Sequence, residues 1–217
     1  MHEALHRVGF CLLDTVLSAE EFHPFCRSFG AVIDDTTVAV RDSLASRPRR
    51  YLSSPGPVPL HSDHPDARYV AWWCERQDHD NGASLLYDSC WLEADLKAEQ
   101  IEALRALRLP CPDRYGVQPT HTELVLVNSC GRERFYFAPW HASALLRKSD
   151  TTGEERSALV HLIRVLERRQ RERKLHAIRL EAGQVLIVDN HRILHGRNEI
   201  SENSPRKLRR VWIEEHV

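Results

Sequence analysis

The sequence lacks long hydrophobic runs and a strong net charge of either sign. Its 217 residues carry 30 Lys and Arg against 31 Asp and Glu, a formal net charge of −1. This balance gives no electrostatic reason to expect nucleic acid or an anionic membrane as a partner. The longest apolar runs are too short to cross a bilayer. The N-terminus has no long apolar core, so we expect no signal peptide and a cytoplasmic location.

The sequence also lacks any Cys-x-x-Cys pair, which argues against a zinc ribbon or a thioredoxin-type site. Six cysteines are scattered along the chain: Cys11, Cys26, Cys74, Cys90, Cys111 and Cys130. An even number leaves a disulfide set open. In a chain of this size without a secretion signal, however, reduced thiols in the core are the favoured interpretation.

Short strands separated by turns, with a few helices, predict the architecture. Helices are expected over residues 2–7, 19–29, 91–109 and 154–174, the second opened by a capping box of Ser18 and Glu21. Strands are expected over residues 9–14 (buried), 31–33, 67–74, 83–87, 177–180, 184–189 and 208–214, with a hairpin of 122–129 and 133–138. We therefore predict a single domain over residues 1–217. Its fold class is mainly β with flanking helices, as in a β-sandwich or jelly roll.

Residues 34–57 are the least regular part of the sequence, although 36–41 have strand character. They predict a long loop, either a functional lid or plain surface. Within it, Arg49 and Arg50 either face an anionic substrate or are simply solvated.

The loop leads to the stretch Val58-Pro-Leu-His-Ser-Asp-His-Pro65, which carries a histidine and a carboxylate two residues apart. On an extended strand, residues i and i+2 point to the same face, so His61 and Asp63 can bind one ion while His64 points away. The alternative is a structural hydrogen bond between His61 and Asp63. That alternative is the more common one for an isolated His-x-Asp.

A second stretch far downstream, Gln184 to Gly196, ends an apolar run with His191 and His195. His191 follows closely on Asn190 and is expected to serve the turn, whereas His195 lies where its side chain can swing toward the sheet interior. Two histidines and one carboxylate on one face of a metal form the ligand set of non-haem Fe(II) oxygenases. Further on, Arg206 and Arg210 stand four apart, and an arginine can hold a carboxylate through two hydrogen bonds.

These patterns resemble a known family. Asp-Asn-x-Arg-x-Leu-His-Gly-Arg at Asp189 to Arg197, followed by Arg206 and Arg210, is similar to the taurine dioxygenase and clavaminate synthase-like superfamily of Fe(II)- and 2-oxoglutarate-dependent oxygenases. The resemblance extends to His61-Ser-Asp63, to the turn Asn81-Gly-Ala-Ser84, and to Gly9-Phe, Leu13 and Phe29-Gly30 near the N-terminus. The turn departs from the family pattern, because it lacks a second glycine and has Ser84 in place of Thr.

The resemblance implies a double-stranded β-helix (a cupin-like jelly roll) and specific roles. Fe(II) would be bound by His61, Asp63 and His195, with 2-oxoglutarate and O2 as cosubstrates. Arg206 would hold the far carboxylate of 2-oxoglutarate, assisted by Ser84. Arg210 would meet an anionic group of the substrate. The presence of Asp63, which related halogenases replace by a small residue, favours hydroxylation or desaturation.

The sequence does not identify the substrate. By analogy with the family we expect a small polar molecule, such as an amino acid or a natural-product intermediate, with release of succinate and CO2. Trp140 and Phe137 are candidates for the substrate side, with packing in the core as the alternative. Tyr69, Trp72 and Trp73 are candidates for either the pocket or the core.

Two other classes of function compete with this hypothesis. One is a zinc-binding jelly roll that hydrolyses or isomerises, which would need no Arg206. The other is a non-enzymatic small-molecule binding protein on the same fold, which would not need the complete metal triad. A nucleic-acid oxygenase is disfavoured, because the chain has no continuous basic stripe.

Overall fold

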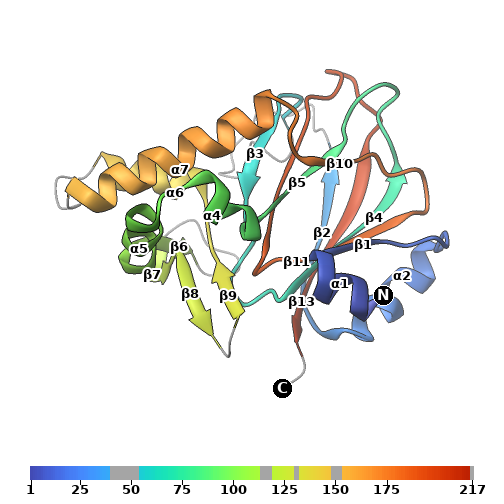
Figure 1. The fold of residues 1–217 in the computed structure, drawn as a ribbon. Coiled ribbons are helices and arrows are strands. Elements are labelled where there is room, and N and C mark those ends of the chain that lie inside the picture. The colour runs from blue at the N-terminus through green and yellow to red at the C-terminus, as the bar shows by residue number, and fades with distance from the viewer. Residues whose placement is uncertain (40–53, 113–118, 130–131, 148–152, 216–217) are drawn as a thin grey trace.

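Two antiparallel sheets lie face to face at the centre of the molecule (Figure 1). The computed structural model describes residues 1–39, 54–112, 119–129, 132–147 and 153–215. The five-stranded sheet has the order β1 (Phe10–Leu12), β11 (Val185–Asp189), β4 (Tyr69–Arg76), β13 (Lys207–Glu215) and β2 (Gly30–Ala39). The four-stranded sheet has the order β10 (His176–Ile178), β5 (Ser84–Asp88), β12 (Ile193–Arg197) and β3 (Val58–His61). This arrangement confirms the predicted jelly roll.

Apolar side chains from both sheets fill the space between them. Along β13, successive side chains point alternately to the inner and the outer face of the sheet. Leu208 and Trp212 point into the core between the sheets, while Val211 and Ile213 belong to a second apolar cluster on the outer face. The core between the sheets consists of Ala67, Val70, Trp72, Cys74, Leu86, Leu180, Leu186, Val188, Ile193, Leu208 and Trp212.

Two N-terminal helices, α1 (His2–Val8) and α2 (Ala19–Arg27), pack against the outer face of the five-stranded sheet. The predicted capping box is present: the Ser18 hydroxyl accepts a hydrogen bond from the Glu21 N–H, and the Ser18 N–H donates to the Glu21 carboxylate. The helix ends at Arg27 rather than Phe29, because Gly30 already begins β2.

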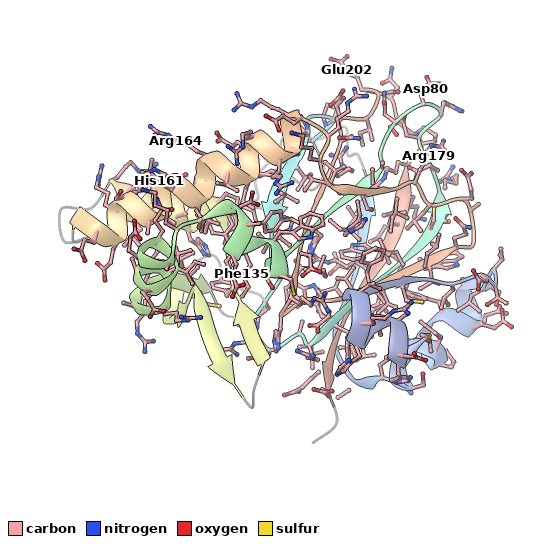
Figure 2. All side chains as sticks on the ribbon, viewed as in Figure 1. Asp80, Phe135, His161, Arg164, Arg179 and Glu202 are labelled. Atoms are coloured by element: carbon pink, nitrogen blue, oxygen red, sulfur yellow. The ribbon has the colours of Figure 1, made fainter. Side chains whose placement is uncertain are left out.

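A larger layer lies on the other side of the molecule (Figure 1). It contains η1 (Ser89–Trp91), α4 (Leu92–Asp95), α5 (Ala98–Ala106), α6 (Pro139–Leu146) and α7 (Gly153–Arg171), with the paired strands β6 (Arg108–Pro112) and β7 (Pro119–Leu124), and β8 (Leu126–Ser129) and β9 (Arg132–Phe135). The buried face of α7 packs into this layer through Leu159, Leu162 and Leu166. The exposed His161 and Arg164 point outward from the same helix (Figure 2).

The single helix predicted over residues 91–109 is wrong. The backbone is extended at Leu96 (φ −127°, ψ 152°) and at Lys97 (φ −76°, ψ 157°), which separates α4 from α5. The Gln100 side chain accepts a hydrogen bond from the Lys97 N–H and so caps the new helix. Pro110 lies within β6, so the prolines do not simply end a helix.

Several other boundaries also differ from expectation. The strand predicted over residues 9–14 is present as β1, but it is only partly buried, since Leu12 is 37% exposed, so the predicted burial is wrong. β2 runs without interruption from Gly30 to Ala39, where a loop was expected from residue 34. The predicted hairpin is present only in part, because β7 pairs with β6 while β8 pairs with β9. Arg49, Arg50 and Cys130 lie outside the described residues.

Among the residues that the structure describes, no helix is both long enough and apolar enough to cross a membrane.

Candidate metal centre

Three buried side chains, His61, Asp63 and His195, meet in the interior of the molecule. Their ligand atoms all lie within 4.8 Å of one another. Nε2 of His61 is 4.0 Å from Oδ1 of Asp63, and Nε2 of His195 is 3.5 Å from Oδ2 of Asp63. The structure therefore brings together the three residues that the sequence predicted as metal ligands.

A β-bulge orients His61 at the end of β3. His61 pairs with His195 of β12, and Val58 pairs with Arg197, so three steps along β3 (58 to 61) match two along β12 (195 to 197). A bulge of this kind re-aims side chains, and Val58 and His61 line the same pocket. Gly196 faces the bulge, where an added Cβ would lie 2.7 Å from the Val58 carbonyl oxygen. The close approach of the two strands therefore requires glycine at this position.

Asp63 does not lie on the strand, contrary to the reasoning that placed it on one strand face with His61. β3 ends at His61, and Asp63 belongs to the loop that follows. The buried Asn190 holds this loop: its Oδ1 accepts a hydrogen bond from the Asp63 N–H at 2.9 Å, and its Nδ2 donates to the carbonyls of His64 and Ala67. A loop fastened by a side chain, rather than strand alternation, thus brings Asp63 to the histidines.

The alternative histidines have other partners. Nδ1 of His64 accepts a hydrogen bond from the Asp66 N–H, and its ring stacks 6.0 Å from that of Trp212. Nε2 of His191 lies 2.6 Å from the Pro65 carbonyl oxygen, and the backbone N–H of His191 donates a hydrogen bond to the Asp189 carboxylate. His191 therefore serves the turn, as the sequence predicted.

Both carboxylate oxygens of Asp63 accept hydrogen bonds from β13. Nη1 of Arg210 donates to Oδ1 at 2.7 Å, and Nε1 of Trp212 donates to Oδ2 at 2.8 Å. Burial alone would raise the pKa of Asp63, but the Arg210 guanidinium and the two histidines hold it well below its usual range. The carboxylate is therefore ionised and can act as a ligand.

His61 is held in the form that a metal needs. Its Nδ1 lies 2.9 Å from the Pro59 carbonyl oxygen, which can only accept, so the proton sits on Nδ1 and Nε2 keeps its lone pair. Burial, and next the proximity of His195, lower the pKa of His61 to about 3. A neutral imidazole with Nε2 directed at Asp63 fits a divalent ion. Together the two histidines and the carboxylate fit Fe(II).

Two triad residues, His61 and His195, form part of the wall of a pocket with about 470 Å³ of empty space, counting its open mouth. The pocket is lined by Val38, Val58, His61, Trp72, Ser84, His195, Gly196, Arg197, Arg206, Leu208 and Arg210. Trp72 is thus a pocket residue, with its ring edge-on to His195 at 4.7 Å.

Arg206 and Ser84, predicted to hold 2-oxoglutarate, line this same pocket. Arg206 is 5% exposed, and among the described residues its Nε has no hydrogen-bond partner. Burial, and next the charge of Arg197, lower the pKa of Arg206 to about 10. Ser84 of β5 pairs with Arg197 of β12. A buried guanidinium that faces a cavity is suited to receive an anion from solution.

The residues predicted for substrate differ in position. Arg210 lines the pocket, but its Nη1 is committed to Asp63, and its Nη2 lies 3.7 Å from Oδ2 of Asp34. The Trp140 ring lies 5.1 Å from that of His61. Phe137 is 2% exposed within the apolar cluster under α5 and α7, and its N–H donates to the Ser62 hydroxyl. Of the two aromatic candidates, Trp140 is the one that contacts a triad residue.

Sequence reasoning missed the supporting residues Asn190, Arg197 and Trp212. Arg197 is 4% exposed and donates to the carbonyls of Ser54, Gly56 and Asn198. A signal existed for Trp212, because it stands two residues after Arg210 on a predicted strand and so shares its face. Asn190 and Arg197 both lie within the Asp189 to Arg197 pattern, in which the sequence analysis assigned a metal-binding role to His195 alone.

Known proteins are similar to this chain in sequence and in architecture. The family model described as taurine catabolism dioxygenase TauD, TfdA family matches residues 1–212. The chain is 25% identical to 3-((Z)-2-isocyanoethenyl)-1H-indole synthase of Fischerella ambigua, over 98% of this chain and 82% of that protein.

Solved structures agree on the fold. PvcB, described as an Fe, alpha-ketoglutarate dependent oxygenase from an isonitrile synthetic pathway, matches with a TM-score of 0.67 and 21% identity, over 98% of this chain and 78% of that one. Asparagine oxygenase in complex with Fe(II), 2S,3S-3-hydroxyasparagine and succinate matches with a TM-score of 0.63 and 18% identity, over 83% of this chain. The match covers 56% of asparagine oxygenase, so this chain spans only about half of that protein's length.

The chain belongs to the TauD/TfdA family, since the family model matches nearly all of it. It is an Fe- and 2-oxoglutarate-dependent oxygenase with the jelly-roll fold, as the sequence predicted.

Proposed function

We propose that this enzyme oxidises an aliphatic C–H bond of a small, amino-acid-derived substrate. In this proposal His61, Asp63 and His195 bind Fe(II), while Arg206 and Ser84 hold the far carboxylate of 2-oxoglutarate. One observation carries the proposal: two residues of the buried triad, His61 and His195, line a single pocket together with the buried Arg206. A metal and an anion anchor in one cavity are what a keto acid needs if it is to chelate the metal and be held at its other end.

Bound iron and 2-oxoglutarate supply the oxidising power, since O2 is consumed as 2-oxoglutarate becomes succinate and CO2. The protein's own residues orient the bound molecules and shield them from water. Trp72, Leu208 and Val38 give the pocket apolar walls that exclude water. Arg206, whose charge is poorly solvated, favours entry of the dianionic cosubstrate over a neutral molecule.

For the substrate we propose an amino-acid derivative rather than a nucleic acid or a lipid membrane. Asparagine oxygenase was solved with a hydroxylated asparagine. Two of the relatives matched over 98% of this chain are named for isonitrile chemistry, and one of these is named for a product with an ethenyl side chain. The oxygenase OrfP, matched over the same share of this chain, was solved with (3S)-hydroxy-L-Arg. These names favour desaturation of an aromatic amino-acid isonitrile as the specific reaction, with hydroxylation of an amino acid as the second candidate. The cytoplasmic location and the single-domain organisation stay predictions.

Trp140 is the residue we propose for the substrate side. Its ring lies 5.1 Å from that of His61, and it is supplied by α6 rather than by the walls around Arg206. An aromatic side chain there can stack on the ring of an aromatic substrate, at centroid distances of about 4.5–7 Å. Phe137, Arg210 and Ser84 keep their sequence-based roles as predictions.

An anaerobic titration of the apoprotein with Fe(II) and then 2-oxoglutarate tests the proposal. We expect a weak visible charge-transfer band that needs both additions and disappears in His195→Ala. The surface variant His161→Ala is the matched control and should keep the band. Succinate release with a panel of amino acids and their isonitriles then identifies the substrate. Absence of the band, together with tight binding of zinc, would refute the iron assignment and favour the zinc alternative.

A further inference from the structure

β13 presents two hydrogen-bond donors to the same carboxylate. Arg210 and Trp212 are two residues apart, so they share the inner face of the strand. Their side chains reach Oδ1 and Oδ2 of Asp63 at 2.7 and 2.8 Å. β13 is paired on both sides, with β4 and with β2, so the two donors stand on a rigid support.

The two donors are also fixed relative to each other. The guanidinium carbon of Arg210 lies 4.7 Å from the centre of the Trp212 ring, within the range of a cation–π contact. Trp212 is 5% exposed and Arg210 is 2% exposed. Neither side chain can adopt another rotamer without disturbing the core between the sheets.

Each oxygen of Asp63 consequently has one donor on β13 and one histidine nearby. Oδ1 lies between Arg210 and His61, and Oδ2 lies between Trp212 and His195. A carboxylate oxygen offers two lone-pair directions. When the β13 donors occupy one direction on each oxygen, the remaining lone pairs are those that face the histidines.

We propose that Trp212 is a positioning residue for the metal: its indole N–H, together with Arg210, fixes the plane of the Asp63 carboxylate so that it binds the ion between His61 and His195. This inference rests on the iron site proposed above. It assigns to Trp212 a role that involves no contact with substrate or cosubstrate. It also gives Arg210 a task besides any contact with an anion.

The test compares three variants of the apoprotein by titration with Co(II), a spectroscopic substitute for Fe(II). Trp212→Phe removes the N–H and keeps an aromatic ring. Trp73→Phe is the matched control, because the Trp73 indole also donates a 2.8 Å hydrogen bond, to the Leu17 carbonyl, on the outer face of the same sheet. Trp212→Gln restores a donor the same number of bonds from Cβ, but it loses the packing of the ring.

We expect Trp212→Phe to weaken Co(II) binding by about 10- to 100-fold, the usual effect of losing a hydrogen bond to a metal ligand. The visible Co(II) spectrum should also change, because the plane of the Asp63 carboxylate is no longer fixed at Oδ2. Trp73→Phe should lower the melting temperature but keep the affinity and the spectrum. Trp212→Gln should bind Co(II) more tightly than Trp212→Phe despite a lower melting temperature, which a purely structural role of Trp212 would not produce.

Three results would overturn the inference. Wild-type affinity and spectrum in Trp212→Phe would remove the positioning role while leaving the iron site intact. An equal loss of affinity in Trp73→Phe would mean that general loosening of the sheet is responsible. If the wild-type protein itself bound no Co(II), the triad would fail, and the role of Trp212 would fail with it.

Discussion

Asn190, in the turn between β11 and β12, accepts a hydrogen bond from the backbone N–H of Asp63, a residue 127 positions earlier in the chain. The same side chain donates to the carbonyls of His64 and Ala67. The loop that carries Asp63 is thus fastened to the turn that leads into β12, the strand of His195.

Replacing Asn190 by Ala should therefore damage both stability and metal binding. Three hydrogen bonds are lost and their buried partners are stranded, so we expect the free energy of unfolding to fall by about 2–4 kcal/mol. Thermal unfolding with and without Co(II) measures both effects, because the rise in melting temperature on metal addition should shrink in the variant. Asn198→Ala, in the segment after β12, is the control. A variant with wild-type stability and an unchanged metal-induced shift would contradict the role of Asn190.

Arg206 should stabilise the complex with 2-oxoglutarate at the expense of the empty protein. Burial lowers its pKa to about 10, so its charge is costly until an anion arrives. Arg206→Met should raise the unfolding free energy of the apoprotein by about 1–3 kcal/mol and abolish tight 2-oxoglutarate binding. Calorimetric titration and urea unfolding test the two halves separately.

Arg209→Met provides the control for Arg206, because Arg209 lies three residues further on, in β13, in a partly exposed ion pair with Asp35. It should change stability by about 1 kcal/mol or less and leave 2-oxoglutarate binding intact. An apoprotein that Arg206→Met clearly destabilises would show that the guanidinium is already well accommodated.

Gly82 should control the position of Arg206. Gly82 has φ 82°, and an added Cβ would lie 3.0 Å from Cδ of Arg206 and 2.9 Å from Cγ2 of Ile200. Gly82→Ala should cost about 1–3 kcal/mol of stability through backbone strain, and it should raise the KM for 2-oxoglutarate more than it lowers kcat. Gly153→Ala, where nothing lies within 4 Å of the new Cβ, is the matched control. Equal KM values in the two variants would argue against a role for Gly82.

His191 should make the protein sensitive to acid. Burial lowers its pKa to about 4, although the hydrogen bond with Pro65 opposes the shift. The unfolded chain, with a histidine pKa near 6.5, binds the proton first, so stability is present above about pH 6.5 and is lost as the pH falls toward 4. The loss reaches about 3 kcal/mol for this group.

Urea unfolding of His191→Gln between pH 7 and pH 4 measures this contribution. The variant should lose less stability than the wild-type protein over that range. His161→Gln, at an exposed position of α7, serves as the comparison. If His191→Gln followed the wild-type curve, the acid sensitivity would have to arise elsewhere.

The sequence predicted the sheet architecture and the residues His61, Asp63 and His195 that the structure brings together, because strand patterns and short motifs are local; their role as metal ligands stays a prediction. Strand alternation, turn residues and the order of the His-x-Asp and His-Gly-Arg motifs are all visible in the chain itself. His195 nevertheless lies on its own strand, β12, which the sequence analysis did not predict, because Gly196 and Arg197 interrupt an apolar pattern.

What the sequence could not give were contacts between distant segments. The break at Leu96, the bulge that orients His61, and the hydrogen bonds from Asn190 and Trp212 to the Asp63 region depend on packing across the whole chain. α6 was not predicted either, since its apolar residues on several sides leave no clear helical stripe.

The place of β3 in its sheet has one more consequence. Among the described strands, β3 lies at the edge of the four-stranded sheet, and it pairs with β12 through a bulge. An ion shared by His61 and His195 would cross-link these two strands by coordination bonds. A chain synthesised in an iron-starved cell would lack that cross-link, and β3 would be among the first segments to unfold locally and become accessible to a protease. The lifetime of the enzyme, and not only its activity, would then follow the supply of iron.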